Sequence, residues 1–237
     1  LMLSSHNLLS PSSGEPTVAP TLDMVLGCYY LTQIRPGAKG TGKTLSSFDE
    51  AKLAYDLGAV GLQAQIEVRD RSLTGGRLRT TVGRIIFNEI LPPELRFVND
   101  IADKKRLHQL VSQAHRLLGT EATAELVDKI KDLGFTYATR SGITFAMSDI
   151  QVPEGKDELL SQADARIAEI QEQYRRGLIT EEERYNEAVA IWTEIGERMS
   201  EAIARSLDRY GSIYMMATSG AKGNIAQIRQ MAGMRGL

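Results

Sequence analysis

The chain has 237 residues, 42% of them hydrophobic, which is enough apolar material for one or two globular domains with their own cores. A formal net charge of −2 excludes a general attraction to nucleic acid or to an anionic membrane, so any binding of phosphates must be local. No apolar run approaches the ~20 residues of a membrane span, and the single cysteine, Cys28, excludes an internal disulfide and suits a reducing compartment. Because Leu1 precedes Met2, we expect a piece of a longer chain.

The first regular element is expected near residue 21. Residues 1–20 are rich in serine, proline and glycine and predict an extended lead-in with turns. Thr21 is expected to cap a helix that carries apolar residues from Met24 to Tyr30 and ends before Pro36.

Residues 37–44 read GAKGTGKT and match the phosphate-binding pattern G-x-x-x-x-G-K-[ST], with Lys43 and Thr44 at its end. The pattern requires a buried strand before the loop and a helix that begins at the Lys-Thr pair. Here the preceding segment ends in an Arg-Pro pair, and the next helix is predicted to begin after Ser47, with Glu50 completing a capping box. We therefore interpret this stretch as a mobile surface loop that binds no nucleotide.

A small region of sheet is predicted next. Apolar residues alternate with polar ones over residues 62–68, which predicts a half-buried strand. Thr74-Gly75-Gly76 predicts a turn, after which residues 77–82 are expected to pair back as a hairpin. A short buried helix follows over residues 85–90 and should end at the Pro92-Pro93 pair.

Two further helices are predicted before residue 135. The first spans residues 103–118 and ends at Gly119, and the second begins with a threonine cap and spans residues 120–134. His108 and His115 lie seven residues apart on the first helix. A metal-binding pair on one helix prefers a spacing of four, so we interpret them as two solvated histidines.

The most regular pattern lies between residues 153 and 207. Apolar residues recur at alternating spacings of three and four, which predicts two helices with coiled-coil seams. Gly177 can adopt the left-handed conformation that ends a helix, and Thr180 with Glu183 forms a capping box that starts the next one. Two seams joined by so short a connection must fold back antiparallel, as a projecting hairpin with its tip at residues 174–180. The expected seam residues are Leu160, Ala163, Ile167, Ile170 and Tyr174 on the first arm, and Tyr185, Val189, Trp192, Met199 and Ile203 on the second, with Ile195 and Gly196 between them.

The last thirty residues combine glycines with cations. Lys222, Arg229 and Arg235 have no acidic neighbours in the sequence, and small residues with such cations suit close approach to a phosphate-bearing ligand. The alternative is a basic loop and helix packed on another part of a parent chain. The residues themselves leave both interpretations open.

Several blocks of the sequence resemble the bacterial RNA polymerase β′ (largest) subunit. They are MLSSHNLLSPSSGEP, DMVLGCYYLT, TTVGRIIFNEILP, LGFTYATRSGI, RGLITEEERYNEAVAIW and, above all, IYMMATSGAKGNIAQIRQMAGMRGL. The resemblance covers essentially the whole chain, in order. It implies a mainly helical α+β fold, with a small mixed α/β pore domain over residues 1–150. Residues 151–237 would form the funnel domain, which carries the coiled-coil hairpin (about 153–207) on the rim of the secondary channel.

The resemblance also implies a function in transcription, as part of cytoplasmic DNA-directed RNA polymerase, a nucleotidyltransferase. The expected partners are the rest of β′, the β and other subunits, the DNA template and RNA, and nucleoside triphosphates (NTPs) in transit, with no membrane. Lys222, Gln227, Arg229 and Arg235 are expected to face nucleotides on their way in. The family usually has arginine where this chain has Lys222, and lysine keeps the charge but loses the fork that grips two phosphate oxygens.

Cleavage factors of the Gre type are implied to dock at the tip of the hairpin, where we expect Arg175, Arg176, Glu183 and Asn186 to form the surface. Glu183 is also occupied in the cap, whereas the two arginines are expected to have no structural duty. The family's catalytic loop, whose three aspartates hold Mg²⁺, is expected just upstream of Leu1. The chain itself is therefore expected to hold no catalytic residue, metal or cofactor, and to be inactive alone.

Two other functions are weighed against this one. The first is a free-standing P-loop NTPase that uses Lys43 and Thr44, which nucleotide binding that disappears in Lys43→Ala would favour. The second is a coiled-coil adaptor whose only task is to bind a partner. Independent folding of the hairpin with a partner, without any larger polymerase, would favour the adaptor.

Overall fold

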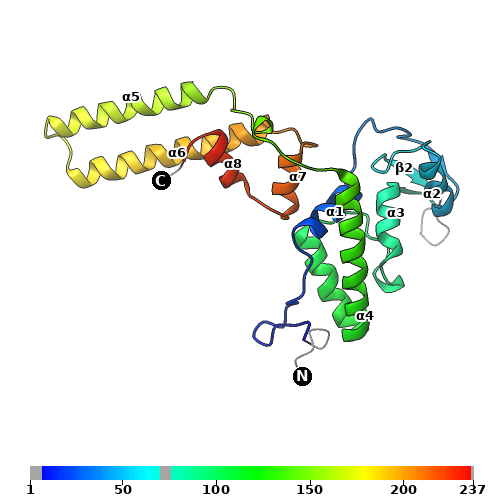
Figure 1. Ribbon diagram of the computed structural model, residues 1–237. Coiled ribbons are helices and arrows are strands. Elements are labelled where there is room, and N and C mark those ends of the chain that lie inside the picture. The colour runs from blue at the N-terminus through cyan, green and yellow to red at the C-terminus, as the bar shows by residue number, and fades with distance from the viewer. Residues whose placement is uncertain (1–6, 70–75, 236–237) are drawn as a thin grey trace. The chain divides into compact units, whose positions relative to one another are not determined.

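The computed structural model describes residues 7–69 and 76–235, which form helices and one small sheet (Figure 1). This confirms the predicted mainly helical α+β class. The chain divides into two compact units: residues up to Ile143 together with Thr218–Lys222, and Thr144–Ala217 together with the residues from Gly223 onward. The assignment of residues 1–150 to a pore and 151–237 to a funnel stays a prediction.

The elements of the first unit are α1 (Asp23–Thr32), β1 (Thr44–Leu45), α2 (Phe48–Asp56), β2 (Ile66–Val68), β3 (Leu78–Thr80), α3 (Val82–Glu89), the 3₁₀ turn η2 (Pro93–Leu95) and α4 (Lys104–Ser141). The second unit contains the 3₁₀ turn η3 (Met147–Asp149), α5 (Lys156–Arg175), α6 (Glu181–Ser206) and α8 (Ile225–Ala232). Helix α7 (Ser212–Ser219) begins in the second unit and ends in the first.

The sheet has the strand order β1-β2-β3. Strand β2 pairs antiparallel with β3, with Ile66 opposite Thr80, which confirms the predicted hairpin. Thr74 and Gly75 of the predicted turn lie outside the described residues. Strand β1 pairs parallel to β2, and the sequence did not predict it, because two residues are too few to show an alternation. Helices α2 and α3 contribute to the core beside these strands.

A buried arginine ties α3 to its surroundings. Arg84 donates from Nε to the carbonyl oxygen of Thr32, at 2.9 Å, and from Nη1 to Asn99. A buried guanidinium is costly unless its donors find acceptors, so these bonds make Arg84 part of the core. The helix itself is capped by Thr81, and it confirms the short buried helix predicted here.

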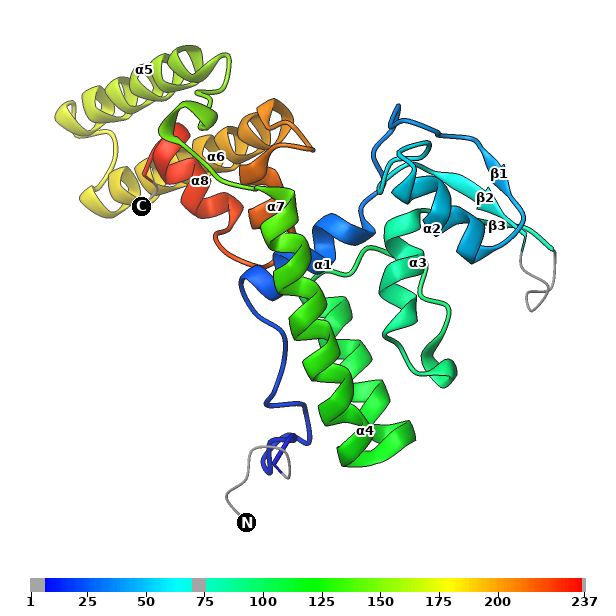
Figure 2. The same cartoon turned by 45° about the vertical axis from the view of Figure 1, so that its right-hand side comes forward.

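Helix α4 turns back on itself at Gly119, whose φ of 79° and ψ of −175° interrupt the helical backbone. In Figures 1 and 2 the two halves of α4 run alongside one another. Asp103, predicted as the first helical residue, instead caps the first half by accepting a hydrogen bond from the backbone N–H of Arg106. His108 and His115 are half-buried rather than fully solvated, and Thr120 Oγ1 lies 3.4 Å from the Nε2 atom of His115.

Two helix boundaries differ from the sequence-based expectation. The second half of α4 does not stop at Gly134 but continues to Ser141, and Gly142 in the left-handed conformation (φ 59°) ends it. Gly134 instead lets α1 approach closely, because a Cβ there would lie 2.6 Å from the Met24 carbonyl oxygen. The side chain of Thr21 makes no cap for α1, since the residue before the helix is Leu22.

The C-terminal end of α7 is fixed to the first unit. The hydroxyl oxygens of Thr218 and Tyr29 lie 3.1 Å apart, which connects α7 to α1. Gly220 then packs against Lys104, because a Cβ on this glycine would lie 3.0 Å from the Cβ of Lys104. These contacts hold the stretch 218–222 beside the start of α4.

Candidate functional site

Helices α5 and α6 form an antiparallel hairpin, as predicted. Arg166 of α5 pairs with Glu194 of α6 at 2.8 Å, and further along, the Arg184 guanidinium lies 5.4 Å from the centre of the Tyr174 ring. Residue numbers therefore rise along one arm as they fall along the other. Figure 1 shows the two arms side by side, joined by a short turn.

The buried seam of α6 confirms the predicted residues from Ile195 to Ile203 but differs from the prediction toward the tip. Ile191, Ile195, Met199 and Ile203 are at most 4% exposed, whereas Tyr185 is 63% exposed. Val189 and Trp192 are half-buried beside the seam rather than inside it. On α5 the prediction is closer: Ala163 and Ile170 are buried, Leu160 and Ile167 are half-buried, and Tyr174 is 41% exposed. The physical reason is that Tyr185, Val189 and Trp192 repeat at the same helical spacing as the seam, so spacing alone does not select the face that α5 covers.

The turn between the arms has the predicted stop and start signals. Gly177 has a φ of 71° and follows the last turn of α5. Thr180 and Glu183 form the expected capping box: the Thr180 N–H donates to Glu183 Oε2 at 2.8 Å, and the Glu183 N–H donates to Thr180 Oγ1 at 3.3 Å. These hydrogen bonds, the backbone one foremost, lower the pKa of the Glu183 carboxyl below its ordinary value of 4.5.

The four residues proposed for docking all lie at or next to this tip and are all exposed. Asn186 is on the first turns of α6, and Glu183 is held in the cap. The two arginines take no part in the cap, but both lie near one carboxylate of α5. Arg176 Nε donates to Glu172 at 2.9 Å, and Arg175 lies 4.0 Å from the same carboxylate. Such exposed pairs contribute little to stability, so both arginines remain accessible to a partner.

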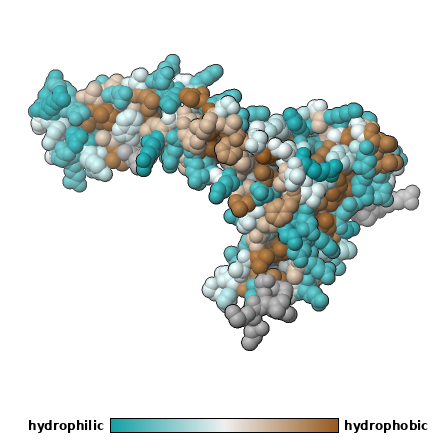
Figure 3. Space-filling view, in the orientation of Figure 1, coloured by the Kyte–Doolittle hydropathy of each residue, from teal (hydrophilic) through white to brown (hydrophobic). Residues whose placement is uncertain are grey.

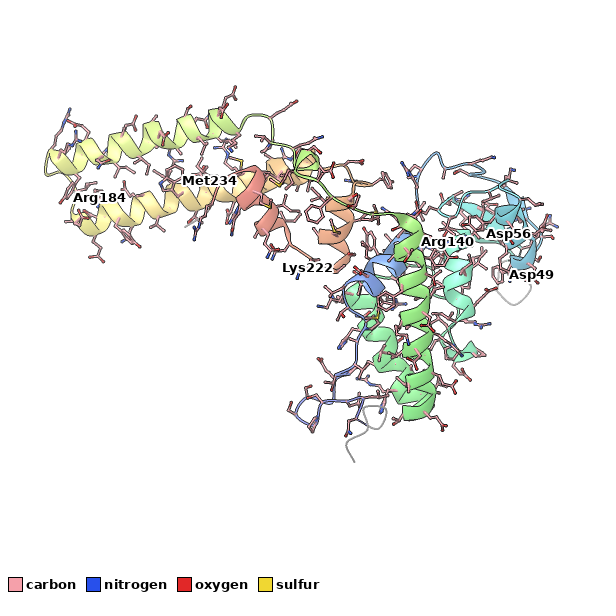
Figure 4. The ribbon with its side chains drawn as sticks, viewed as in Figure 1. Asp49, Asp56, Arg140, Arg184, Lys222 and Met234 are labelled. Carbon is pink, nitrogen blue, oxygen red and sulfur yellow. The ribbon has the colours of Figure 1, made fainter. Side chains whose placement is uncertain are left out.

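Arg184 also lies at the tip, although it was not among the docking residues expected from the sequence. Its guanidinium lies over the Tyr174 ring of the other arm and also pairs with Glu181, one turn earlier on its own helix. The hydrogen bond from Arg184 is the main cause of a lowered pKa of Glu181. Figure 4, in which Arg184 is labelled, shows it between the two arms. The Glu181–Arg184 spacing of three was a local signal for the pair, but the contact with Tyr174 depends on the register of the hairpin.

Helix α8 packs on α6 at the base of the hairpin. Arg229 donates from Nη1 to the Gly196 carbonyl oxygen and to Ser200 Oγ, both at 3.3 Å. A methyl group on Gly196 would lie 3.4 Å from that nitrogen, which is an ordinary van der Waals distance, so the guanidinium packs directly on this part of α6. The half-buried Arg229 therefore holds α8 against α6. The sequence did not indicate this role, because it shows only that Arg229 has no acidic neighbour.

The four expected nucleotide-facing residues are divided between the two units, and their shared role stays a prediction. Lys222 belongs to the first unit, whereas Gln227, Arg229 and Arg235 belong to the second. Lys222, Gln227 and Arg235 are exposed, and the backbone N–H of Gln227 donates to the Asn224 cap of α8 at 2.8 Å. Of the four side chains, Arg229 is the one that is turned onto a neighbouring helix.

The stretch 37–44 lacks the structural context of a P-loop, as the sequence indicated. Thr44 begins strand β1 rather than a helix. The next helix, α2, starts at Phe48 after the predicted cap, in which Ser47 Oγ accepts from the Glu50 N–H at 3.1 Å. Glu50 closes the box one residue earlier than expected, since its carboxylate accepts from Ser46.

The expectation that this loop is mobile is wrong. The Gly42 N–H donates to the Gln65 carbonyl oxygen at 2.8 Å, and Lys39 accepts from the Gly61 N–H at 2.7 Å. Lys43, the residue that would reach a phosphate in a P-loop, instead donates from Nζ to the Ala59 carbonyl oxygen at 3.1 Å. Hydrogen bonds to neighbouring segments therefore hold the loop in place.

The remaining candidate features are metal ligands, membrane spans and the cysteine. Over residues 7–69 and 76–235, no group of three or more histidine, cysteine or acidic residues is placed to hold a metal ion. None of the helices in the same ranges combines the length and the apolar character that crossing a membrane requires. Cys28 is fully buried, which raises the pKa of its thiol to about 12 and makes it an unreactive core residue.

Known proteins match this chain over its whole length. The family RNA polymerase Rpb1, domain 3, matches residues 7–150, and RNA polymerase Rpb1, domain 4, matches residues 179–237. The DNA-directed RNA polymerase subunit beta' of Dehalococcoides mccartyi strain 195 is 54% identical over 236 residues, which is 100% of this chain and 18% of the relative. The same subunit of Desulforamulus reducens is 52% identical over 237 residues, covering 100% of this chain and 20% of the relative.

The chain thus spans about a fifth of the length of the curated relatives that it matches. Domain 3 of the family precedes domain 4 along the chain, as their numbers imply. The domain 3 match includes the sheet, and the domain 4 match includes α6, α7 and α8. On these matches, the chain belongs to the RNA polymerase Rpb1 family, and corresponds to a segment of the bacterial β′ subunit.

Proposed function

We propose that this segment forms part of the secondary channel, or funnel, through which NTPs enter DNA-directed RNA polymerase, and that the α5–α6 hairpin is a coiled-coil docking arm for Gre-type cleavage factors. The observation that carries the proposal is the tip of the hairpin. There, a capped turn presents exposed polar side chains at the end of two helices that are packed against each other.

The geometry of the arm suits a docking function. Helix α5 has 20 residues and α6 has 26, so at 1.5 Å per residue they extend about 30 and 39 Å. Ala163, Ile170, Ile191 and Ile195 hold the arms together. On the face seen in Figure 3 the tip of the hairpin is hydrophilic, whereas apolar residues appear between polar ones along its length. Because the apolar contacts between the arms lie along their length, the polar residues at the tip remain exposed and accessible to a partner.

The nucleotide-facing function of Lys222, Gln227, Arg229 and Arg235 belongs to the same proposal. The exposed cations Lys222 and Arg235 are the stronger candidates for direct phosphate contacts. Arg229 would act chiefly through the position of α8, because its Nη1 donates to α6. Because Lys222 has a compact ammonium group and not a planar guanidinium, we expect it to contact one phosphate oxygen and not two at once.

In the complete, cytoplasmic enzyme, the transfer of nucleotides would take place outside this segment. The catalytic aspartates would lie in the part of β′ upstream of this segment and would hold Mg²⁺, with one ion to activate the RNA 3′-hydroxyl and another to steady the leaving pyrophosphate. The described residues hold no fitting ligand cluster, so no step of the transfer is assigned to them. The segment would contribute the entry route and the docking arm, in contact with the rest of β′, the β subunit, template DNA and RNA.

The experiment replaces the two tip arginines in a complete polymerase. Rim charges mostly set the association rate and its salt dependence. We expect an Arg175→Ala/Arg176→Ala enzyme to synthesise RNA normally but to bind a Gre-type factor more slowly, most clearly at low salt. Arg205→Ala is the matched control, because Arg205 is equally exposed and pairs with a glutamate one turn away, at the base of the arm. Unchanged association at every ionic strength would assign docking to another surface.

A further inference from the structure

Helix α6 carries an apolar stripe beside its seam. Tyr185, Val189, Trp192 and Gly196 follow one another at spacings of four, three and four residues, and so they lie on one face of the helix. This face borders the seam residues Ile191 and Ile195, and Trp192 packs against their cluster from the edge. Tyr185 is 63% exposed, and Val189 and Trp192 are half-buried.

Helix α8 covers the base of this stripe but not the part toward the tip. Arg229 of α8 sits on Gly196. Met234, just after α8, packs against the same cluster of seam residues as Trp192, and Figure 4, which labels Met234, shows it beside α6. Val189 and Tyr185 lie one and two turns beyond Trp192, toward the tip. The open part of the stripe therefore continues an interface that the protein has already built with a helix.

The charge around the open stripe is acidic. Residues 172–187 contain five glutamates and three arginines, which gives a net charge of −2. All three arginines have glutamate partners: Arg175 and Arg176 share Glu172, and Arg184 pairs with Glu181. Glu182, which precedes Tyr185 by one turn on the same side, is exposed and has no ion pair within the described part of the chain.

We propose that the open stripe, Tyr185–Val189–Trp192, docks an amphipathic helix of a protein partner, one whose apolar residues are bordered by lysine or arginine. The apolar side chains of such a helix would extend the interface made by α8, and its cations would meet the glutamates at the start of α6. This surface lies along the side of α6, apart from the tip residues Arg176 and Glu183. It does not depend on the proposed docking of Gre-type factors.

Trp192 provides a direct test, because it is the only tryptophan in the chain. The probes are two synthetic 18-residue helical peptides with the same leucine stripe, bordered by lysines in one and by glutamates in the other. Titration of the 237-residue chain with the lysine peptide should change the Trp192 emission in a saturable way. Binding should weaken at least tenfold in Tyr185→Asp and in the milder Tyr185→Ser variant. It should also weaken as salt is raised, because the charges are exposed.

Ala190→Asp is the matched control, since it adds the same charge at an exposed position on α6 that lies off the stripe. This variant should bind the lysine peptide as the wild-type chain does. Equal binding of the glutamate peptide would overturn the charge argument. Full binding by Tyr185→Asp, or the absence of saturable binding by either peptide, would overturn the proposed surface.

Discussion

Gly27 of α1 and Gly134 of α4 lie so close that a Cβ atom on Gly27 would be 1.8 Å from the Gly134 carbonyl oxygen. Glycines in the middle of helices are unfavourable by about 1 kcal/mol relative to alanine. Here they let the two helix backbones approach each other, and the neighbouring residues Val25, Leu26 and Cys28 are buried around α1. The crossing of α1 and α4 is therefore a principal packing contact of the first unit.

The first prediction concerns this crossing. Gly27→Ala should lower the free energy of unfolding by about 1–3 kcal/mol, because the added methyl forces the backbones apart and this outweighs the gain in helix propensity. Urea unfolding followed by circular dichroism measures it. Gly61→Ala is the control, since the nearest atom to its new Cβ would be 3.5 Å away. Equal effects of the two substitutions would contradict the close approach.

The second prediction separates the seam of α6 from the stripe beside it. Ile195 is fully buried, so Ile195→Ala should cost about 2–5 kcal/mol. Tyr185→Ala should change stability by less than about 0.5 kcal/mol, because the ring is largely exposed. Both can be followed by the fluorescence of Trp192 during denaturation. A larger loss of unfolding free energy in Tyr185→Ala than in Ile195→Ala would contradict this assignment and favour the seam predicted from the spacing.

The third prediction is a pH dependence at the tip. The pKa of Glu183 is lowered in the folded chain by its hydrogen bonds from Thr180, so the ionised carboxylate stabilises the start of α6. This contribution is complete above the ordinary value of 4.5 and is lost as the pH falls through the lower pKa of the folded state. The protection factor of the Thr180 amide, which is its exchange rate relative to the intrinsic rate at the same pH, should therefore fall on acidification. Glu183→Gln should remove this pH dependence; an unchanged profile would show that the cap does not depend on the charge.

The fourth prediction concerns residues 37–44. Titration with ATP and Mg²⁺ should give no saturable signal, because Lys43 is bonded to Ala59 and Thr44 starts a strand. The same loop should resist limited proteolysis, because hydrogen bonds to two other segments hold it. Lys43→Ala should leave the ATP titration unchanged and make the loop easier to cleave. Micromolar ATP binding that depends on Lys43 would contradict this account.

Local signals predicted the ends of the hairpin well. Gly177 and the Thr180–Glu183 box act through their own backbone and their immediate neighbours, so the sequence alone is sufficient to place them. The face of α6 that is buried was harder to predict. Ile191 and Trp192 both fit a helical repeat, and only the position of α5 decides that Ile191 is covered.

The remaining errors have the same origin. Gly134 was predicted to end a helix because glycine often does, but the approach of α1, more than a hundred residues earlier in the chain, explains its presence. Arg229 has no acid nearby in the sequence, yet it finds acceptors on α6 at Gly196 and Ser200. The candidate tip residues could be placed from the sequence, whereas their partners across the hairpin, such as Tyr174 for Arg184, could not.

The most direct test of the docking arm removes it from a complete polymerase. Residues 168–191 can be replaced by a four-residue turn, which keeps the Arg166–Glu194 pair and the core around Met199 and Ile203. The affinity of a fluorescently labelled Gre-type factor for this enzyme and for the intact one is then measured, with template-directed RNA synthesis as the control for assembly. We predict that the shortened enzyme synthesises RNA and loses the factor. An unchanged dissociation constant in an active, shortened enzyme would contradict the account.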